Sequence, residues 1–130
     1  MTRISRFFSS RALCIQMVTI AVVSLWIRMA FPIFAQAWAA YDDLLFVRWA
    51  SQMGRGSWLG AYDELTHAKG VGFSLFLLAN HFTGLPLKFT EHALYLATAA
   101  CFAITVGRLY HSRAVVLVTF FLLAFIPTAW

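Results

Sequence analysis

Two adjacent carboxylates, Asp42 and Asp43, open the most polar stretch of a very apolar chain. Neighbouring carboxylates repel each other, and this raises their joint affinity for a proton or a divalent cation. The pair could therefore act as a general base or as ligands of a divalent metal ion. Capping of a helix by a solvated carboxylate is the alternative that the spacing alone leaves open.

Two basic residues are candidates for binding a phosphate-bearing substrate. Lys69 directly precedes an apolar run, and the small residues Gly70 and Gly72 beside it permit the close approach of a lipid phosphate. Arg28 lies within the first apolar run, where a guanidinium is costly unless it has a partner. For both cations the competing interpretation is a side chain that extends to the membrane interface.

Composition indicates which kind of scaffold positions these residues. The chain has 130 residues, of which 62% are hydrophobic and 12% are charged, and its mean hydropathy is +0.76. A soluble domain usually carries about 25% charged residues, so this chain has too little polar surface for a water-exposed globule. Its net charge of +5 comes from scattered cations at the ends of apolar runs, which favours membrane lipid over nucleic acid as the partner.

We therefore predict an all-α, polytopic transmembrane helix bundle in a single domain. Four apolar runs predict membrane-spanning helices at residues 12–34, 71–87, 93–107 and 114–130, with a polar loop at 35–70. The second and third runs are short for a span of about 20 residues, so they could borrow flanking residues, or one could be re-entrant. Cys14 and Cys101, inside apolar runs, are interpreted as small buried side chains.

The basic N-terminus sets the predicted orientation. Arg3, Arg6 and Arg11 favour a cytoplasmic N-terminus and place the polar loop at the outer face, as in a protein of the bacterial inner membrane. Cleavage of the first run as a signal peptide is the alternative, but Arg28 would then lie in an overlong region before the cleavage site. Arg108 and Arg113 conflict with four membrane-spanning helices. If all four runs span, the turn between the third and fourth helices, which contains both arginines, lies outside, against the tendency of positive charge to lie inside. Lys88 and Glu91 would then mark the inner turn.

Helical periodicity appears within the polar loop, from Asp42 to Met53. One face of this predicted helix is apolar, and we expect it to lie in the membrane interface with Asp42 or Asp43 as its N-terminal cap; the apolar face comprises Leu45, Phe46, Trp49, Ala50 and Met53. Asn80 and His81 interrupt the second apolar run, and His81 is predicted to form hydrogen bonds between helices.

The order of these features is more specific than any one of them. Arg28 is followed by Tyr41-Asp42-Asp43, then by Gly56-Ser57-Trp58-Leu59-Gly60-Ala61-Tyr62, and then by Lys69-Gly70-Val71-Gly72-Phe73. Over residues 28–87 this order resembles the N-terminal part of the GT-C type polytopic membrane glycosyltransferases, which include protein mannosyltransferases and the aminoarabinose transferase of lipid A.

The resemblance implies transfer of a sugar from a polyprenyl-phosphate-linked donor to an acceptor at the outer membrane face. It gives Asp42 or Asp43 the role of activating the acceptor or binding a divalent metal ion, and it gives Lys69 contact with the donor phosphate. Members of this family have many more transmembrane helices, so we expect the chain to be an N-terminal fragment that is inactive alone. A non-catalytic subunit or lipid-binding scaffold, and a small transporter using Arg28, Asn80 and His81, are the alternatives.

Overall fold

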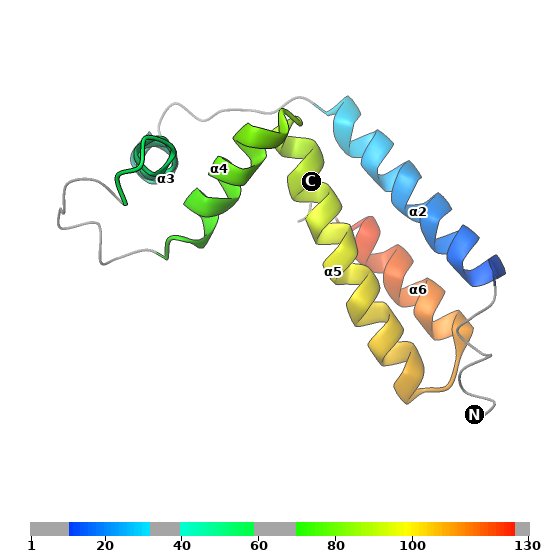
Figure 1. Cartoon of the computed structure of the whole chain (residues 1–130). Helices are drawn as coiled ribbons and strands as arrows, with labels where there is room; N and C mark the ends of the chain where they lie inside the picture. Colours follow the sequence, from blue (N-terminus) through cyan, green and yellow to red (C-terminus); the bar gives the residue numbers. More distant parts are fainter. Residues whose placement is uncertain (1–10, 32–39, 59–69, 127–130) are drawn as a thin grey trace. The chain divides into compact units, whose positions relative to one another are not determined.

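The computed structural model describes residues 11–31, 40–58 and 70–126, and for residues 40–43 it describes the backbone only. These residues form five α-helices and no strand (Figure 1). The helices belong to two compact units, which we call the three-helix unit and the helical hairpin. The three-helix unit contains α2 (Arg11–Ala30), α5 (Leu87–Leu109) and α6 (Arg113–Ala124), and the helical hairpin contains α3 (Ala40–Gly54) and α4 (Gly72–Thr83).

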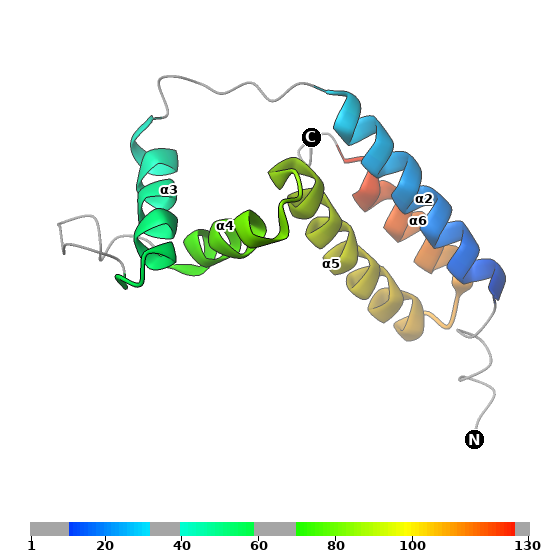
Figure 2. The ribbon, with the colours of Figure 1, turned by 45° about the horizontal axis from the view of Figure 1, so that its top comes forward.

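The helices of the three-helix unit alternate in direction around a small core. A tight turn at residues 110–112 reverses the chain between α5 and α6, and the hydroxyl of Ser112 accepts a hydrogen bond from the backbone of Val115 to cap α6. Ser24, near the end of α2, contacts His92 near the start of α5 and Ala124 at the end of α6. Helix α2 is therefore antiparallel to α5 and parallel to α6, and Figure 2 shows α2 running beside α6.

Small residues bring the three helices close together. The buried core comprises Leu13, Leu96, Ala99, Ala103, Val116, Phe120 and Ala124. A Cβ atom added at Gly107 would lie 2.0 Å from Cγ2 of Val116, so only glycine permits this approach of α5 to α6. Small residues at helix contacts are typical of membrane bundles, in which packing rather than the hydrophobic effect drives helix association.

Two of the described helices, α2 and α5, are long and apolar enough to cross a membrane. Helix α4 has 12 residues and is about 18 Å long, which is well short of the hydrocarbon thickness of about 30 Å. Helix α6 is apolar but also has 12 described residues. Four spanning helices, as the sequence predicts, are thus not found among the described residues.

The outer surface of the three-helix unit is strongly apolar. Only 11% of the apolar stretch of α2 and 28% of that of α5 are buried, whereas the core helices of soluble proteins are mostly buried. Cys14 and Cys101 are free and exposed on this surface, so the prediction that they are buried is wrong. Ile15 and Phe102, which follow them in the sequence, face outward with them, whereas Leu13 belongs to the core, because the core is lined by only one face of each helix.

Helix α3 confirms the helix predicted within the polar loop, but its apolar face has a different partner. Trp49 is 1% exposed, and Leu45 and Ala50 are also buried. Phe46 meets Phe73 of α4 edge to face, with 5.2 Å between the ring centroids. The apolar face of α3 is thus covered by α4, and the prediction that it lies against the membrane interface is wrong.

The path from α4 to α5 also differs from the prediction. Gly84 ends α4 with φ +67°, a left-handed conformation that glycine adopts without strain. Pro86 follows, and α5 begins at Leu87 rather than at Ala93, which lengthens the third apolar run at its N-terminal end. Lys88 and Glu91 therefore lie in the first turns of a helix instead of in a connecting turn.

Candidate functional site

The predicted site residues are only partly within the described structure. Asp42 and Asp43 fall in the first turn of α3, which begins at Ala40, so neither occupies the cap position that the sequence suggested. Their side chains, and the whole of Lys69, lie outside the described residues. Arg28 is half-buried in the last turn of α2. Whether the carboxylates, the lysine and the arginine share one site therefore stays a prediction.

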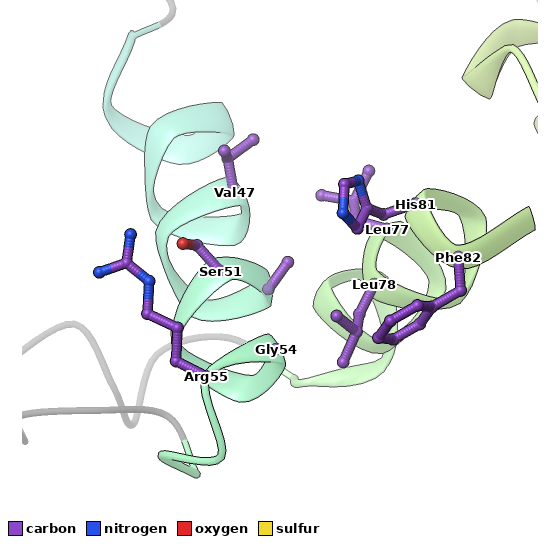
Figure 3. Close-up of a pocket in the computed structure, with 9 residues that line it drawn as sticks. Val47, Ser51, Gly54, Arg55, Leu77, Leu78, His81 and Phe82 are labelled. Atoms are coloured by element: carbon purple, nitrogen blue, oxygen red, sulfur yellow. The ribbon is translucent and has the colours of Figure 1, made fainter. Parts of the chain in front are cut away.

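A pocket of about 480 Å³ lies between α3 and α4 (Figure 3). Its α3 side is formed by consecutive turns of the helix, and its α4 side by the second half of that helix. Gly54 brings the two helices together, because a Cβ atom there would lie 3.2 Å from Cδ1 of Leu78. The pocket is lined by Val47, Ala50, Ser51, Gly54, Arg55, Leu77, Leu78, His81 and Phe82.

The pocket combines an apolar interior with polar groups on both helices. Val47 and Leu77 face one another across it, and His81 presents its ring from the α4 side (Figure 3). The guanidinium of Arg55 and the hydroxyl of Ser51 lie together on the side of α3 away from α4. The side chains that face the cleft between α3 and α4 are therefore mainly apolar, with the ring of His81 as the polar group among them.

Two polar residues flank the end of α4. The hydrogen bonds predicted for His81 are not found among the described residues, where its ring packs 5.9 Å from that of Phe82. Asn80 donates through Nδ2 to the carbonyl of Leu85, which holds the turn after α4. Asn80 therefore has a local structural role, and His81 is available to the pocket.

A second polar cluster lies inside the three-helix unit, where the sequence analysis expected none. The hydroxyl of Ser24 donates to the carbonyl of Ala124 over 2.7 Å, and it lies 2.9 Å from Nε2 of His92. The hydroxyl of Tyr95 donates to the carbonyl of Leu123 over 2.8 Å. Ser24 is fully buried and His92 nearly so. These contacts join all three helices at one end of the unit.

The single proton of the Ser24 hydroxyl determines which ring nitrogen of His92 carries a hydrogen. A hydroxyl has one donor, and Ser24 uses it for the carbonyl of Ala124. His92 must therefore donate from Nε2, which carries a hydrogen whether the ring is neutral or protonated. The cluster provides the carbonyl of Ala124, at the end of α6, with a donor, and it gives the carbonyl of Leu123 a second donor besides the backbone of Ile126.

The end of α2 is satisfied in the same way. Lys88 is buried, at 7% exposure, and its ammonium donates to the carbonyl of Phe31, just beyond the last residue of α2. Arg28 lies in the last turn of the same helix and acts electrostatically on His92. Cations at the C-terminal end of a helix are stabilised by its partial negative charge. Arg28 therefore has a structural explanation besides the predicted phosphate contact.

A periodic signal could have revealed this cluster. The buried residues of α5 recur every three or four positions along one face: Lys88, His92, Leu96, Ala99, Ala103 and Gly107. The polar members thus continue the stripe of small residues that packs against the other helices. A helix predicted to begin at Ala93 omits Lys88 and His92, which are the polar end of this stripe.

Comparisons with protein-family models, with curated proteins and with solved structures returned no match to this chain. Among the described residues, no group of three or more histidine, cysteine, aspartate or glutamate side chains could hold a metal ion. The function must therefore be argued from the two polar sites and from the order of motifs in the sequence.

Proposed function

We propose that this chain is part of a membrane glycosyltransferase that moves a sugar from a polyprenyl-phosphate-linked donor to an acceptor at the outer membrane face. The observation that carries this proposal is the helical hairpin. It begins with the acidic pair in the first turn of α3, and it contains a largely apolar pocket whose lining residues include Arg55. An acidic group, a cation and space for a lipid chain are what this transfer requires.

Location in a membrane is supported by α2 and α5, most of whose apolar side chains face outward rather than into the small core. A contiguous apolar exterior of this kind suits hydrocarbon and is unfavourable in water. We place the protein in the bacterial inner membrane, in keeping with the proposed donor. Membrane lipid is thus the first partner in this proposal.

The orientation follows from the ends of the three-helix unit. Because α2 is parallel to α6, Arg11 lies at the same end as the turn between Arg108 and Arg113. The opposite end has the cations Arg28 and Lys88. The richer positive charge at the first end favours a cytoplasmic N-terminus. With α4 too short to span, the turn after α5 also lies inside, which removes the conflict that four spans create.

The transfer itself assigns a role to each predicted residue. Asp42 or Asp43 accepts the proton of the acceptor hydroxyl as its oxygen forms a bond to the anomeric carbon of the sugar. The bond from that carbon to the phosphate oxygen breaks, and Lys69 and Arg28 stabilise the charge left on the phosphate. A divalent metal ion held by the two carboxylates would serve the same end, and it is part of the proposal.

The experiment is a transfer assay on membranes of cells in which the protein is produced from its own gene. Asp42→Asn and Asp43→Asn keep the side-chain size and remove the proton acceptor, so one of them should lower sugar transfer by about 10²–10⁴-fold. Glu91→Gln is the control, because Glu91 is an exposed carboxylate in α5. Transfer at the wild-type rate in both aspartate variants, at equal protein levels, would refute the proposal.

A lipid-binding scaffold without catalysis is the second candidate. The observation that favours it is that the described part of the pocket has a cation and a histidine but no carboxylate. A scaffold would retain lipid binding after Asp42→Asn and Asp43→Asn, and its source membranes would show no transfer that depends on either residue. The same pair of measurements therefore separates the two candidates.

A further inference from the structure

Lys88 is a buried cation whose partner among the described residues is a neutral carbonyl. It is 7% exposed, and its ammonium donates to the carbonyl of Phe31. A hydrogen bond to a carbonyl does not require a charge, because the hydroxyls of Ser24 and Tyr95 serve the carbonyls at the end of α6. A buried ammonium is unusual without an anion that compensates its charge. The carbonyl therefore explains a donor at this position but not a cation.

A second cation lies at the same end of the three-helix unit. The contact between Ser24 and His92 fixes the register of α2 against α5. Residues four positions apart share a face of a helix, so Arg28 follows Ser24 on the inner face of α2. Lys88 likewise precedes His92 on the inner face of α5, and because the helices are antiparallel both steps lead toward the same end. The electrostatic action of Arg28 on His92 agrees with this register.

The three-helix unit offers little negative charge to compensate these two cations. The unit comprises residues 1–32 and 88–130, in which Glu91 is the only acidic residue of the sequence. Glu91 is exposed, and among the described residues it forms no salt bridge with Arg28 or Lys88. The positive charge at this end of the unit is thus left without an anion from the described part of the unit.

Arg28 lies at the depth of lipid phosphates. It is about 26 Å along α2 from Arg11, close to the hydrocarbon thickness of about 30 Å. Trp26, two residues before it, is 72% exposed, and tryptophan is typical of the membrane interface. A half-buried guanidinium at this depth meets the phosphate layer of the leaflet at this end. The anion that is missing from the unit is therefore available from the membrane.

We propose that Arg28 and Lys88 together bind the phosphate group of an anionic membrane lipid at this end of the three-helix unit. Arg28 donates to the phosphate oxygens through two parallel hydrogen bonds. Lys88, bonded to the carbonyl of Phe31 just beyond α2, adds a charge that its burial protects from screening by salt. The inference stands on these contacts and not on the proposed function. Two lipids provide the required group: a phospholipid with net negative charge, and the polyprenyl-phosphate-linked donor.

Binding is measured by native mass spectrometry on the purified full chain in detergent. Dioleoylphosphatidylglycerol should bind about tenfold more tightly than dioleoylphosphatidylcholine, which has the same chains and a phosphate but no net charge. Equal binding of the two phospholipids would overturn the proposal. Inorganic phosphate should not bind measurably, because without a hydrocarbon chain it is not concentrated in the micelle. Binding of inorganic phosphate as tight as that of the lipid would show that the site does not select a lipid.

Farnesyl phosphate, a short polyprenyl phosphate, distinguishes the two sources of the phosphate group. Tighter binding of farnesyl phosphate than of dioleoylphosphatidylglycerol would assign the site to the sugar donor. The opposite order would assign it to a phospholipid of the membrane. Both orders support the site if binding depends on Arg28, and failure of both lipids to bind would overturn it.

Helix α2 offers a matched control for the charge of Arg28. Arg28→Gln should weaken binding of the tighter lipid by about tenfold, which corresponds to loss of one charge-assisted hydrogen bond. Arg28→Lys keeps the charge and should retain the preference for an anionic lipid. Arg11→Gln removes an exposed cation at the opposite end of the same helix and should leave binding within about twofold of wild type. Equal weakening by Arg28→Gln and Arg11→Gln would show general attraction to a basic protein and would overturn the proposal.

A second pair of variants tests the buried charge. Lys88→Met keeps the apolar stem and removes the charge, so it should reduce the preference for dioleoylphosphatidylglycerol over dioleoylphosphatidylcholine severalfold. Lys88→Arg keeps both the charge and a donor for the carbonyl of Phe31, and it should retain the preference. Far-ultraviolet circular dichroism checks that each variant keeps its helical content. An undiminished preference in folded Lys88→Met would show that Lys88 serves only the carbonyl and would overturn the proposal; if this variant does not fold, the Arg28 variants decide alone.

The outcomes also separate this proposal from the proposed function. Lipid binding that depends on Arg28 and Lys88, in a protein whose membranes show no sugar transfer, would retain the lipid site and refute the enzyme. Sugar transfer that depends on Asp42 or Asp43, in a protein whose lipid binding is the same with Arg28→Gln as without it, would retain the enzyme and refute the lipid site.

Discussion

The buried hydroxyl of Ser24 offers the sharpest test of how the three-helix unit is held together. Ser24→Ala removes one oxygen atom from a site that has no solvent exposure. Two groups then lose their partner at once: the carbonyl of Ala124 loses its donor, and Nε2 of His92 loses its acceptor. Water cannot easily replace the oxygen, because the alanine leaves little space and the surroundings are buried.

The size of the effect follows from these two bonds. Hydrogen bonds between helices in membranes contribute about 0.6 kcal/mol on average and about 1.7 kcal/mol at most. Two such bonds give a loss of about 1.2 to 3.4 kcal/mol in the free energy of unfolding. We expect the upper half of this range for Ser24→Ala, since both abandoned groups stay buried and an unsatisfied buried group costs about 1–3 kcal/mol.

The assay is reversible unfolding of the purified chain in mixed micelles with increasing dodecyl sulfate, followed by far-ultraviolet circular dichroism. Thr19→Val is the matched control in the same helix, because the hydroxyl of Thr19 is exposed and bonds only to the carbonyl of Ile15 one turn earlier. That change should shift the free energy of unfolding by no more than about 0.5 kcal/mol.

A double-mutant cycle isolates the contact between the two side chains. Ser24→Ala, His92→Ala and the double variant should give a coupling free energy of about 0.6 to 1.7 kcal/mol. A coupling near zero would show that the hydroxyl and the imidazole do not interact. A loss for Ser24→Ala no larger than that for Thr19→Val would refute the argument that the cluster stabilises the end of α6.

Three further predictions concern packing, an unsatisfied group and orientation. Gly107→Ala should lower the free energy of unfolding by about 1–3 kcal/mol in the same assay, because its methyl group overlaps Val116; an unchanged midpoint would contradict the close approach of α5 to α6. Ser74→Ala should leave stability unchanged or raise it by about 1 kcal/mol, because the buried hydroxyl has no partner among the described residues; a clear loss would reveal a partner. In a cysteine-free background, Ser57→Cys should react with an impermeant thiol reagent in intact cells, and Ser112→Cys only after permeabilisation; the reverse pattern would invert the proposed orientation.

Features that depend on local sequence were predictable. Helix α3 was expected from its periodicity between Asp42 and Met53, and the structure extends it by only a few residues to Ala40 and Gly54. Its buried face was also expected, since Leu45, Trp49 and Ala50 recur at helical spacing. The partner of that face was not, because a hydrophobic pattern shows that a face is buried without showing whether lipid or another helix covers it.

The path of the chain after the first apolar run could not be predicted in this way. The predicted runs before and after Pro86, residues 71–87 and 93–107, have similar lengths, so their lengths do not favour ending one helix early and extending the next. In the structure, the left-handed turn at Gly84 ends α4, and α5 begins at Leu87. They give α5 a length of 23 residues, enough to span, and leave α4 with 12.

The candidate site was also predictable only in part from the sequence. The sequence identified Asp42, Asp43 and Lys69 from the order of motifs, and their mutual arrangement stays a prediction. The pocket beside Arg55 depends on how α3 and α4 cross, which no local pattern encodes. Arg55 is among the residues that line the pocket, although its guanidinium lies on the side of α3 away from α4 (Figure 3).

The polar residues of the three-helix unit have structural roles at the ends of the helices. Such residues usually suggest a transport path or a catalytic group. In this unit, however, Ser24, Tyr95 and Lys88 all donate to backbone carbonyls at the ends of α6 and α2. Helix ends at membrane depth need these donors, because lipid offers none. The demand of the backbone thus explains these three hydrogen bonds without a substrate.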